Sequence, residues 1–599
     1  MDARIANVIR THWLVFLIVF GLGLVYSSHH FFIPLLLDPV EGIYNPLPQQ
    51  GYGDEVLLYG ARSHAVFENF GIRGDFSLAE YPMSPAFLPI LPPLLLGGLG
   101  KLFGSFEYGI IASDFIFPSL IFLVLYLLMR EIGIEKRVSL LFIALFSLSP
   151  QFGISSPPIS LTHIKTLAQT VFPYLAKNEI LYFSHFDEPK LTFLFFSFFI
   201  YALVRALKRN GRNDTILAGI SFGILFYTYL YDWATMMTSL GILGMFFFIT
   251  KDYRRLRIVA AIGGIGIVIS SYYWINLLML QHLSSADDVI ARLGGEFSHN
   301  VRFATVWKSY IRAISLVALL WFFLRHRVKE GIIVLSAILL SYLVVVNEQV
   351  ITGFNVEPDH WYRIQFLPIS MSVFLLCYAL YRQYGEVYIK KYASTIFVIF
   401  FIYFFGSAFA GQYIYAQSQA NIFVTSRLYK EGFEWLNGHT EPGSVVGTVS
   451  FSGNLHLQMH TANKIFVPFG LSTIASEDEL WKRFMIMARL FNVNTNTFAS
   501  LISKESVAYY LFGDQYGSRT FDAAFFFHKW RIPDPLLAEK IKIYEKSFGN
   551  EHTLLSLYRL DYLFVDQKEF PNWSKPSHDL FGPLTEVFDN GRVVIYSFK

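Results

Sequence analysis

The chain has 599 residues, of which 54% are apolar and only 16% charged, and its mean hydropathy of +0.42 excludes an ordinary soluble domain. The formal net charge of +3 is nearly neutral for this length, so the chain lacks the basic field with which proteins attract nucleic acid. The single cysteine, Cys377, excludes an intrachain disulfide and a cysteine-rich metal site. We therefore expect a polytopic α-helical membrane protein that does not bind nucleic acid.

The first membrane span is expected at residues 13–37. This apolar run has the length of a signal anchor, follows Arg4 and Arg10, and is followed by no convincing cleavage site. Ten further spans are predicted from later apolar runs, with boundaries that can shift by several residues. The eleven predicted spans are 13–37, 108–129, 138–154, 191–205, 215–231, 233–250, 258–280, 310–324, 331–347, 364–381 and 393–411.

Lysine and arginine are concentrated in alternate connections between these spans. The basic connections are 129–137, 205–212, 251–257, 325–329 and 382–392. Because cytoplasmic loops carry the excess of basic residues, we expect these loops and the N-terminus to be cytoplasmic. The other connections, 38–107, 155–190, 281–309 and 347–363, and the C-terminal domain are then extracytoplasmic. A multi-pass protein of the plasma membrane is the expected location.

The first long loop, 38–107, is predicted to contain two helices outside the membrane. One begins near Gly53 and places Val56, Tyr59, Ser63, Val66 and Phe70 on one face at helical spacing. The second lies in the apolar stretch from Pro85 to Gly104, which is interrupted by proline and glycine. Counting this stretch as a span would invert every later loop against the charge pattern, so we predict an interfacial helix.

The tail changes to the composition of a soluble domain. We expect a transmembrane domain over 1–411, a linker at 412–425 and an extracytoplasmic α/β or α+β domain over 426–599. The predicted elements are a helix in LYKEGFEWLNGH, strands in SVVGTVSF, KIFVPF and DYLFVDQ, and a hairpin turned at Asp589-Asn590-Gly591. His456 and His460 fall in a predicted loop-strand region without metalloprotease spacing, so we do not expect a zinc site there.

The acidic pair Asp54-Glu55 stands at the start of the first predicted outer helix. Carboxylates favour helix N-termini because of the helix dipole, and this explains an acidic pair without any chemistry. Moving a sugar from a lipid phosphate to an acceptor requires a base for the acceptor's proton, and a carboxylate within hydrogen-bond reach can serve. One carboxylate is sufficient, since phosphate leaves readily when cations stabilise its charge.

The order of motifs around this pair resembles a known superfamily. The loop carries GDEVLLYGAR at 53–62 and YPMSP at 81–85, followed by LFGSFEYG at 102–109 and a second span that ends in the basic MREIG at 129–133. This order is similar to that of the GT-C superfamily of polyprenyl-phosphate-dependent glycosyltransferases, nearest to its protein O-mannosyltransferase and aminoarabinose transferase branches. The resemblance implies a GT-C-like membrane domain and a catalytic carboxylate in the first loop, at Asp54 first and Glu55 second.

Cations for the phosphate of a lipid-linked donor are expected in the loop 347–363. His360 and Arg363 flank Trp361 and Tyr362 at the mouth of the tenth span, and a guanidinium presents a planar fork of donors to phosphate. Arg62, within the first-loop motif, is a third candidate. The alternative for the late loop is an interfacial belt in which these residues only anchor the protein at headgroup depth.

The second outer loop ends in a cluster of His185, Asp187, Glu188 and Lys190. These side chains can ligate a divalent cation or orient the acceptor, and they can equally form a solvated cluster of paired charges. No other cofactor is expected. Asp114 in the second span implies a partner that the sequence does not name, because an unpaired charge at this depth is costly.

The predicted function is that of a membrane glycosyltransferase. It would move a sugar, with inversion, from a polyprenyl-phosphate donor to a glycan, lipid or protein acceptor at the outer face of the membrane. The alternative is a transporter or flippase of lipid-linked sugars, for which charged residues near the midplane and paired repeats would be expected.

Overall fold

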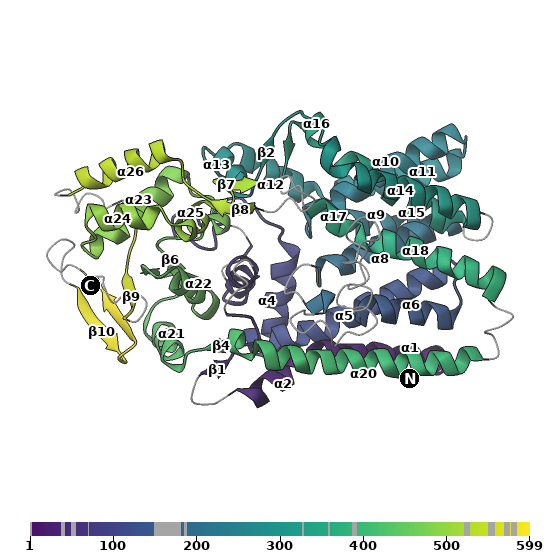
Figure 1. The fold of residues 1–599 in the computed structure, drawn as a ribbon, viewed down its shortest axis with the longest axis horizontal. Coiled ribbons are helices and arrows are strands. Elements are labelled where there is room, and N and C mark those ends of the chain that lie inside the picture. Colours follow the sequence, from purple (N-terminus) through teal and green to yellow (C-terminus); the bar gives the residue numbers. More distant parts are fainter. Residues whose placement is uncertain are drawn as a thin grey trace.

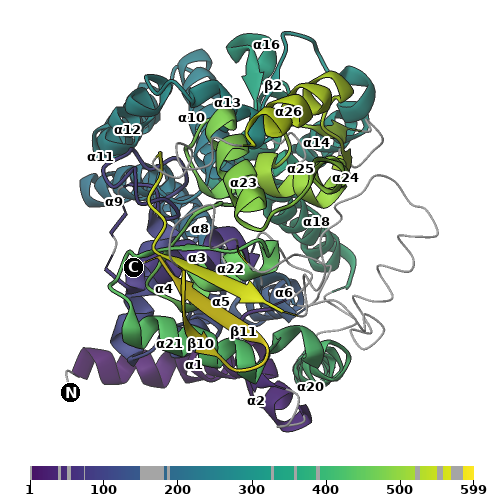
Figure 2. The ribbon, with the colours of Figure 1, turned by 90° about the vertical axis from the view of Figure 1, so that its left-hand side faces the viewer.

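The computed structural model of the chain describes residues 3–37, 42–49, 55–69, 71–72, 74–148, 181–184, 189–325, 329–356, 360–385, 392–519, 527–548, 557–567, 576 and 584–598. It has two parts, a bundle of long helices and a smaller C-terminal part that combines helices with a mixed sheet (Figure 1). Viewed from the C-terminal part, its helices and sheet lie over one end of the bundle (Figure 2). We call this end of the bundle the domain face.

Six helical stretches of the described residues are long and apolar enough to cross a membrane, and a bent pair makes a seventh. The six are α1 (Ala3–Ser27) continuing into α2 (His29–Leu36), α5 (Phe106–Glu131), α10 (Leu230–Ile249), α14 (Phe303–Leu324), α18 (Phe366–Leu380) continuing into η5 (Tyr381–Gly385), and α20 (Ala393–Gln419) continuing into η7 (Ala420–Phe423). The pair is α11 (Tyr253–Ile269) and α12 (Ser271–Gln281), bent by 56°. The chain is therefore a multi-pass membrane protein.

The other four predicted spans are helices that do not meet the same test as far as they are described. They are α6 (Lys136–Leu148), α8 (Thr192–Arg209), α9 (Arg212–Leu225) and α15 (Lys329–Val345). Three of them have 13, 14 and 17 residues, fewer than the roughly 20 that a span needs. α8 has 18 residues but ends in Arg205, Lys208 and Arg209. Among the described residues a helix thus lies within each of the eleven predicted ranges, and six to seven helical stretches are long and apolar enough to cross.

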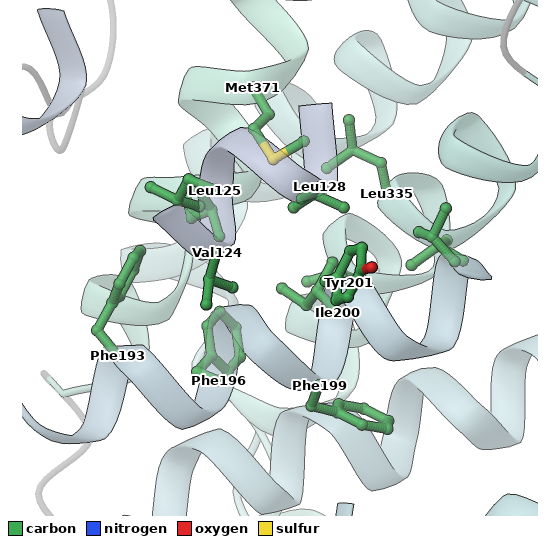
Figure 3. Packing of buried hydrophobic residues seen from close by; sticks show 14 of the residues in the cluster. Val124, Leu125, Leu128, Phe193, Phe196, Phe199, Ile200, Tyr201, Leu335 and Met371 are labelled. Carbon is green, nitrogen blue, oxygen red and sulfur yellow. The ribbon is translucent and has the colours of Figure 1, made fainter. Parts of the chain in front are cut away.

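The core of the bundle consists of close-packed aliphatic and aromatic side chains (Figure 3). The contacts join four helices: Val124, Leu125 and Leu128 of α5 meet Phe193, Phe196 and Ile200 of α8, with Leu335 of α15 and Met371 of α18 close by. The bundle also exposes large apolar side chains such as Phe322 and Ile402, as a surface in contact with lipid requires.

The first loop forms a helical hairpin against the start of α5. Its helices are η1 (Glu55–Gly60), which runs into α3 (Ala61–Phe67), and α4 (Leu91–Phe103). Gly104 ends α4 with a positive φ of 81°, and the Ser105 hydroxyl accepts the Tyr108 amide to begin α5. A Cβ on Gly109 would lie 2.4 Å from the Gly100 nitrogen, so only glycine permits α4 and α5 to come this close. At 13 residues α4 is shorter than the roughly 20 residues that a membrane span needs.

The C-terminal part is built on a five-stranded mixed sheet of order β10-β11-β9-β5-β6. Its strands are β5 (Val445–Gly447), β6 (Lys464–Ile465), β9 (Tyr562–Asp566), β10 (Thr585–Asp589) and β11 (Val593–Ser597), in which β5 is parallel to β6 and β9 and the others pair antiparallel. The surrounding elements are α21 (Arg427–His439), α22 (Phe451–His460), η8 (Gly470–Ser472), α23 (Glu477–Leu490), α24 (Thr495–Ile502), α25 (Glu505–Phe512), β7 (Gly517–Arg519), β8 (Phe527–Trp530) and α26 (Asp534–Lys546). The predicted helix, strands and final hairpin are present.

One local prediction is wrong. His456 and His460 lie on helix α22 rather than in a loop-strand region. The helix begins because the Ser450 hydroxyl accepts the Gly453 amide at 2.7 Å, which caps its N-terminus. The two imidazole rings stack with their centroids 6.0 Å apart.

Described segments of three loops lie together at the domain face. β1 (Ile43–Tyr44) pairs with β4 (Val424–Thr425), and β2 (Glu296–Phe297) pairs with β3 (Phe354–Asn355). In the loop that holds α13 (Ala286–Arg292), the Ser285 hydroxyl donates to the Ile474 carbonyl oxygen of the C-terminal part. The remaining short elements are η3 (Tyr182–Ser184), α16 (Gln349–Thr352) and α17 (Trp361–Ile364). These described segments of the loops and of the C-terminal part thus lie on one side of the bundle.

Candidate active site

The first-loop motif forms a helix between the bundle and the C-terminal part. Asp54 lies outside the described residues, and of Glu55 the structure describes the backbone only, at the start of η1. On one side of this helix a Cβ added to Gly60 would lie 2.6 Å from Met459 Sδ of α22. On the other side a Cβ on Gly97 of α4 would lie 2.8 Å from the Ser63 carbonyl oxygen. The helix that begins with the acidic motif is therefore held from both sides.

The Arg62 side chain is hydrogen-bonded to the turn that precedes α4. Its Nη2 donates to the carbonyl oxygens of Leu88 at 3.1 Å and Pro89 at 2.8 Å. These bonds satisfy backbone acceptors that α4, which begins at Leu91, does not pair. The side chain predicted as a phosphate ligand thus also fixes the hairpin of α3 and α4.

The segment 360–363 is placed at the start of α10. His360 Nδ1 lies 3.0 Å from the Tyr229 hydroxyl, and the Trp361 indole donates to Asn355 Oδ1 at 3.1 Å. Trp361 is buried with its ring edge-on to Tyr231, whereas the Arg363 side chain is exposed. Burial lowers the pKa of His360, and the charge of Arg363 acts in the same direction. His360 is therefore a neutral hydrogen-bonding group at pH 7, and Arg363 supplies the positive charge.

One turn connects the first-loop hairpin with this segment. The Leu91 amide at the start of α4 donates to the Tyr227 carbonyl oxygen at 2.9 Å. Tyr227 stands two residues before Tyr229, the partner of His360. The structure thus brings the α3–α4 hairpin and the 360–363 segment to a common place at the domain face.

Lys190 is a buried partner of Asp114 rather than a surface residue. Its Nζ donates to Asp114 Oδ1 at 2.6 Å and to the Ser113 hydroxyl at 2.8 Å. His30 Nε2 donates to the other carboxylate oxygen, Oδ2, at 2.7 Å. The partner that Asp114 required is thus identified as a pair of donors. His185, Asp187 and Glu188, predicted with Lys190, lie outside the described residues.

Asp75 connects the first loop to the C-terminal part, and in the sequence it is marked only as an acid in a loop. Its carboxylate accepts the amides of Ser77 and Leu78 at 2.8 and 3.0 Å. It also accepts the Ile474 amide at 2.9 Å and the Thr473 hydroxyl at 2.5 Å. Burial raises the pKa of Asp75, and these four hydrogen bonds oppose the rise.

Further contacts extend this seam, by which we mean the contact between residues 45–81 and the C-terminal part. The Ile465 amide at the end of β6 donates to the Ser77 carbonyl oxygen at 3.0 Å, so the first loop borders the sheet. The Lys464 ammonium donates to the carbonyl oxygens of Asp75 and Phe76 at 3.0 and 2.9 Å. Burial lowers the pKa of Lys464 to about 8.

Three histidines lie in or next to the same seam, with His456 stacked on His460. His64 Nδ1 donates to the Gln458 carbonyl oxygen at 3.2 Å, and His460 Nε2 lies 3.2 Å from Gln49 Oε1. Burial lowers the pKa of His64 and of His456 to about 4. The pKa of His460 is also lowered by burial, and the charges of His456, His64 and Lys430 add to this effect. The imidazole rings of these three histidines are therefore neutral at pH 7.

The free energy of unfolding is expected to fall as the pH drops from about 6.5 to about 4. Histidines of the unfolded chain take up protons near pH 6.5, whereas these three remain neutral in the fold, so the unfolded state binds more protons in this window. Thermal unfolding of the purified chain between pH 7.5 and 4.5 measures the slope. The variant with His64, His456 and His460 all changed to Gln should show a smaller slope, because glutamine does not titrate; equal slopes would contradict the assignment.

Comparison with known proteins reveals likeness in structure only. No family model matches the chain, and no curated protein matches it in sequence. Over nearly its whole length it is similar in structure to GT-C glycosyltransferases. The Archaeoglobus fulgidus oligosaccharyltransferase in its apo form is 12% identical, with a TM-score of 0.43, over 93% of this chain and 70% of that one. ArnT from Cupriavidus metallidurans bound to undecaprenyl phosphate is 12% identical, with a TM-score of 0.41, over 96% and 97%.

A third similar structure is the arabinofuranosyltransferase AftD from Mycobacteria, 12% identical with a TM-score of 0.45 over 98% of this chain and 41% of that one.

Proposed function

We propose that the chain is a glycosyltransferase that takes a sugar from a polyprenyl-phosphate donor at the outer face of the membrane. One observation carries the proposal: the helix that begins with the acidic motif shares the domain face with the 360–363 segment, and the turn through Tyr227 and Tyr229 connects them. A base for the acceptor and a cation for the leaving phosphate are the two groups that such a transfer requires.

Each predicted site residue has a role in this mechanism. Asp54, or Glu55 beside it, accepts the proton of the acceptor as its oxygen or nitrogen attacks the anomeric carbon. The bond from that carbon to the phosphate oxygen breaks on the opposite side, so the configuration inverts. Arg363 stabilises the phosphate that leaves, and neutral His360 donates a hydrogen bond to it. Arg62 holds the hairpin that carries the base.

The domain face would be the outer face of the membrane, as the distribution of lysine and arginine predicts. The division into a membrane domain over 1–411, a linker over 412–425 and an extracytoplasmic domain over 426–599 follows from the same topology. His185, Asp187 and Glu188 would orient the acceptor from the second loop, whereas Lys190 is committed to Asp114.

An assay that follows a labelled sugar distinguishes the proposed glycosyltransferase from a transporter of lipid-linked sugars. Membranes that contain the chain are incubated with polyprenyl-phosphate sugars labelled in the sugar, and both the lipid fraction and the lipid-free fraction are counted. We expect label to leave the lipid and to become covalently bound to an acceptor only in membranes with the chain. Movement of intact labelled lipid across sealed vesicles, without transfer, would instead indicate a flippase and overturn the proposal.

A further inference from the structure

A group of potential metal ligands includes none of the residues to which the transfer reaction is assigned above. One ring nitrogen of His29, one of His30 and one carboxylate oxygen of Asp114 all lie within 4.8 Å of one another. All three side chains are buried, with 2%, 5% and 3% of their surfaces exposed. They come from the end of the first candidate span and from the second, where ionisable groups are costly and therefore mark function by default.

Each of these three side chains also makes a hydrogen bond to a second group outside the cluster. His29 Nδ1 donates to the Tyr26 carbonyl oxygen at 3.0 Å, and His30 Nδ1 is hydrogen-bonded to the Tyr44 hydroxyl. Asp114 Oδ1 accepts from Lys190 Nζ at 2.6 Å. Such outer partners fix the tautomer and orientation of metal-binding histidines and carboxylates. The atoms left to act as ligands are the Nε2 atoms of the two histidines and Oδ2 of Asp114.

A proton now occupies the position that a metal would take. His30 Nε2 and Asp114 Oδ2 are 2.7 Å apart, the length of a hydrogen bond. Two ligands of a tetrahedral zinc ion, each about 2.0–2.1 Å from the metal, stand about 3.3 Å apart. A small outward movement of either side chain is sufficient, and the proton of His30 Nε2 would move to Nδ1 of the same ring as Nε2 binds the metal. The Tyr44 hydroxyl would then accept a hydrogen bond from His30 Nδ1 in place of donating one.

We propose that His29, His30 and Asp114 form a binding site for zinc. Two imidazoles and one carboxylate are the ligand set of late first-row divalent metals, whereas magnesium and calcium require oxygen ligands. Three protein ligands leave a fourth position open for water or a substrate group. The site connects the first span to the second and, through Tyr44, reaches the start of the first loop. Lys190, predicted from the sequence together with His185, Asp187 and Glu188, takes part as an outer partner.

The positive charge of Lys190 is expected to weaken the binding of zinc at this site. Its ammonium group sits on the same carboxylate and repels a divalent cation, so it weakens the site without occupying the oxygen that would ligate. Lys190→Met is therefore expected to raise the zinc affinity by about tenfold or more. If the cluster were only a buried ion pair, the same change would leave Asp114 unbalanced and confer no affinity for metal. A zinc site and a buried ion pair thus predict different zinc binding by Lys190→Met.

Metal analysis of the purified full-length chain tests the site without an activity assay. The protein is stripped with a chelator and titrated with zinc, and bound zinc and the melting temperature are measured. We expect one zinc per wild-type chain with a rise in melting temperature, both of them lost in His29→Ala and in His30→Ala. His282→Ala serves as control, because His282 is an exposed histidine whose Nδ1 also contacts a backbone carbonyl oxygen of its own helix.

Wild type and Lys190→Met keep the test decisive even if the histidine variants fail to fold. Zinc should raise the melting temperature of Lys190→Met by more than that of wild type, because the metal replaces the lost positive charge. Wild-type protein that neither retains zinc nor responds to it would overturn the proposal, as would histidine variants that both bind as much zinc as wild type. Failure here leaves the proposed transfer reaction untouched, since the base and the phosphate ligands are other residues.

Discussion

Asp54→Asn is expected to lower the rate of sugar transfer by about 10²–10⁴-fold, the range over which a general base contributes. Asparagine has the same size and keeps the hydrogen-bonding shape of the side chain, but it does not accept a proton at neutral pH. Binding of the donor should change little, because the phosphate is held by other groups. The measurement is the initial rate of label transfer in membranes with equal amounts of the two proteins.

Glu55→Gln is the matched variant. The two acids are neighbours at the start of the same helix, so loss of charge at this site is common to both substitutions. A large loss in only one variant identifies the base, and Asp54 is the expected one. Full activity in both variants would show that the base lies elsewhere, and the proposed mechanism would then be wrong even if transfer itself is observed.

The sequence predicted the fold well where a local pattern of residues determines the secondary structure. Apolar runs predicted the long described helices of the bundle because backbone groups in lipid must be paired within a helix. The number of helices that cross was less predictable, because α8 and α15 combine apolar interiors with short length or charged ends. Helix α22 was missed because its N-terminal signal is a single serine, and its apolar residues show no strong period.

The sequence predicted individual residues of the candidate site but not the residues that they contact. A buried Asp114 implied a partner, but Lys190 and His30 stand 76 and 84 residues away in the sequence. Only the packing of α2 and α5 and the start of α8 reveals them. Asp75 was indistinguishable from a solvated loop acid, because its partners Thr473 and Ile474 lie almost 400 residues further on. Long-range polar contacts of this kind leave no local pattern.

Asp75→Ala is expected to destabilise the seam by at least about 3 kcal/mol and to lower transfer with it. The substitution removes one acceptor for three amides and a hydroxyl, and each buried donor left unpaired costs about 1–3 kcal/mol, less where water enters. Asp75→Asn should cost less, because its remaining oxygen can still accept the amides of Ser77 and Leu78. The Ile474 amide then loses its partner.

Thermal unfolding and limited proteolysis of the first loop measure the effect. Asp287→Ala, which removes an exposed carboxylate on α13 at the same face, is the control and should change neither. Greater cleavage of the first loop in Asp75→Ala, at a temperature where the bundle is intact, would show that the C-terminal part holds this loop in place.

A double-mutant cycle tests the contact itself. Thr473→Val keeps the shape of the side chain and removes the hydroxyl that donates to Asp75, so its effect should shrink when Asp75 is already asparagine. Additive effects would mean that the two side chains do not interact. Coupling between them would make the C-terminal part a positioning element of the first loop, because Asp75 and the helix with the acidic motif belong to one continuous segment that reaches the base within about twenty residues.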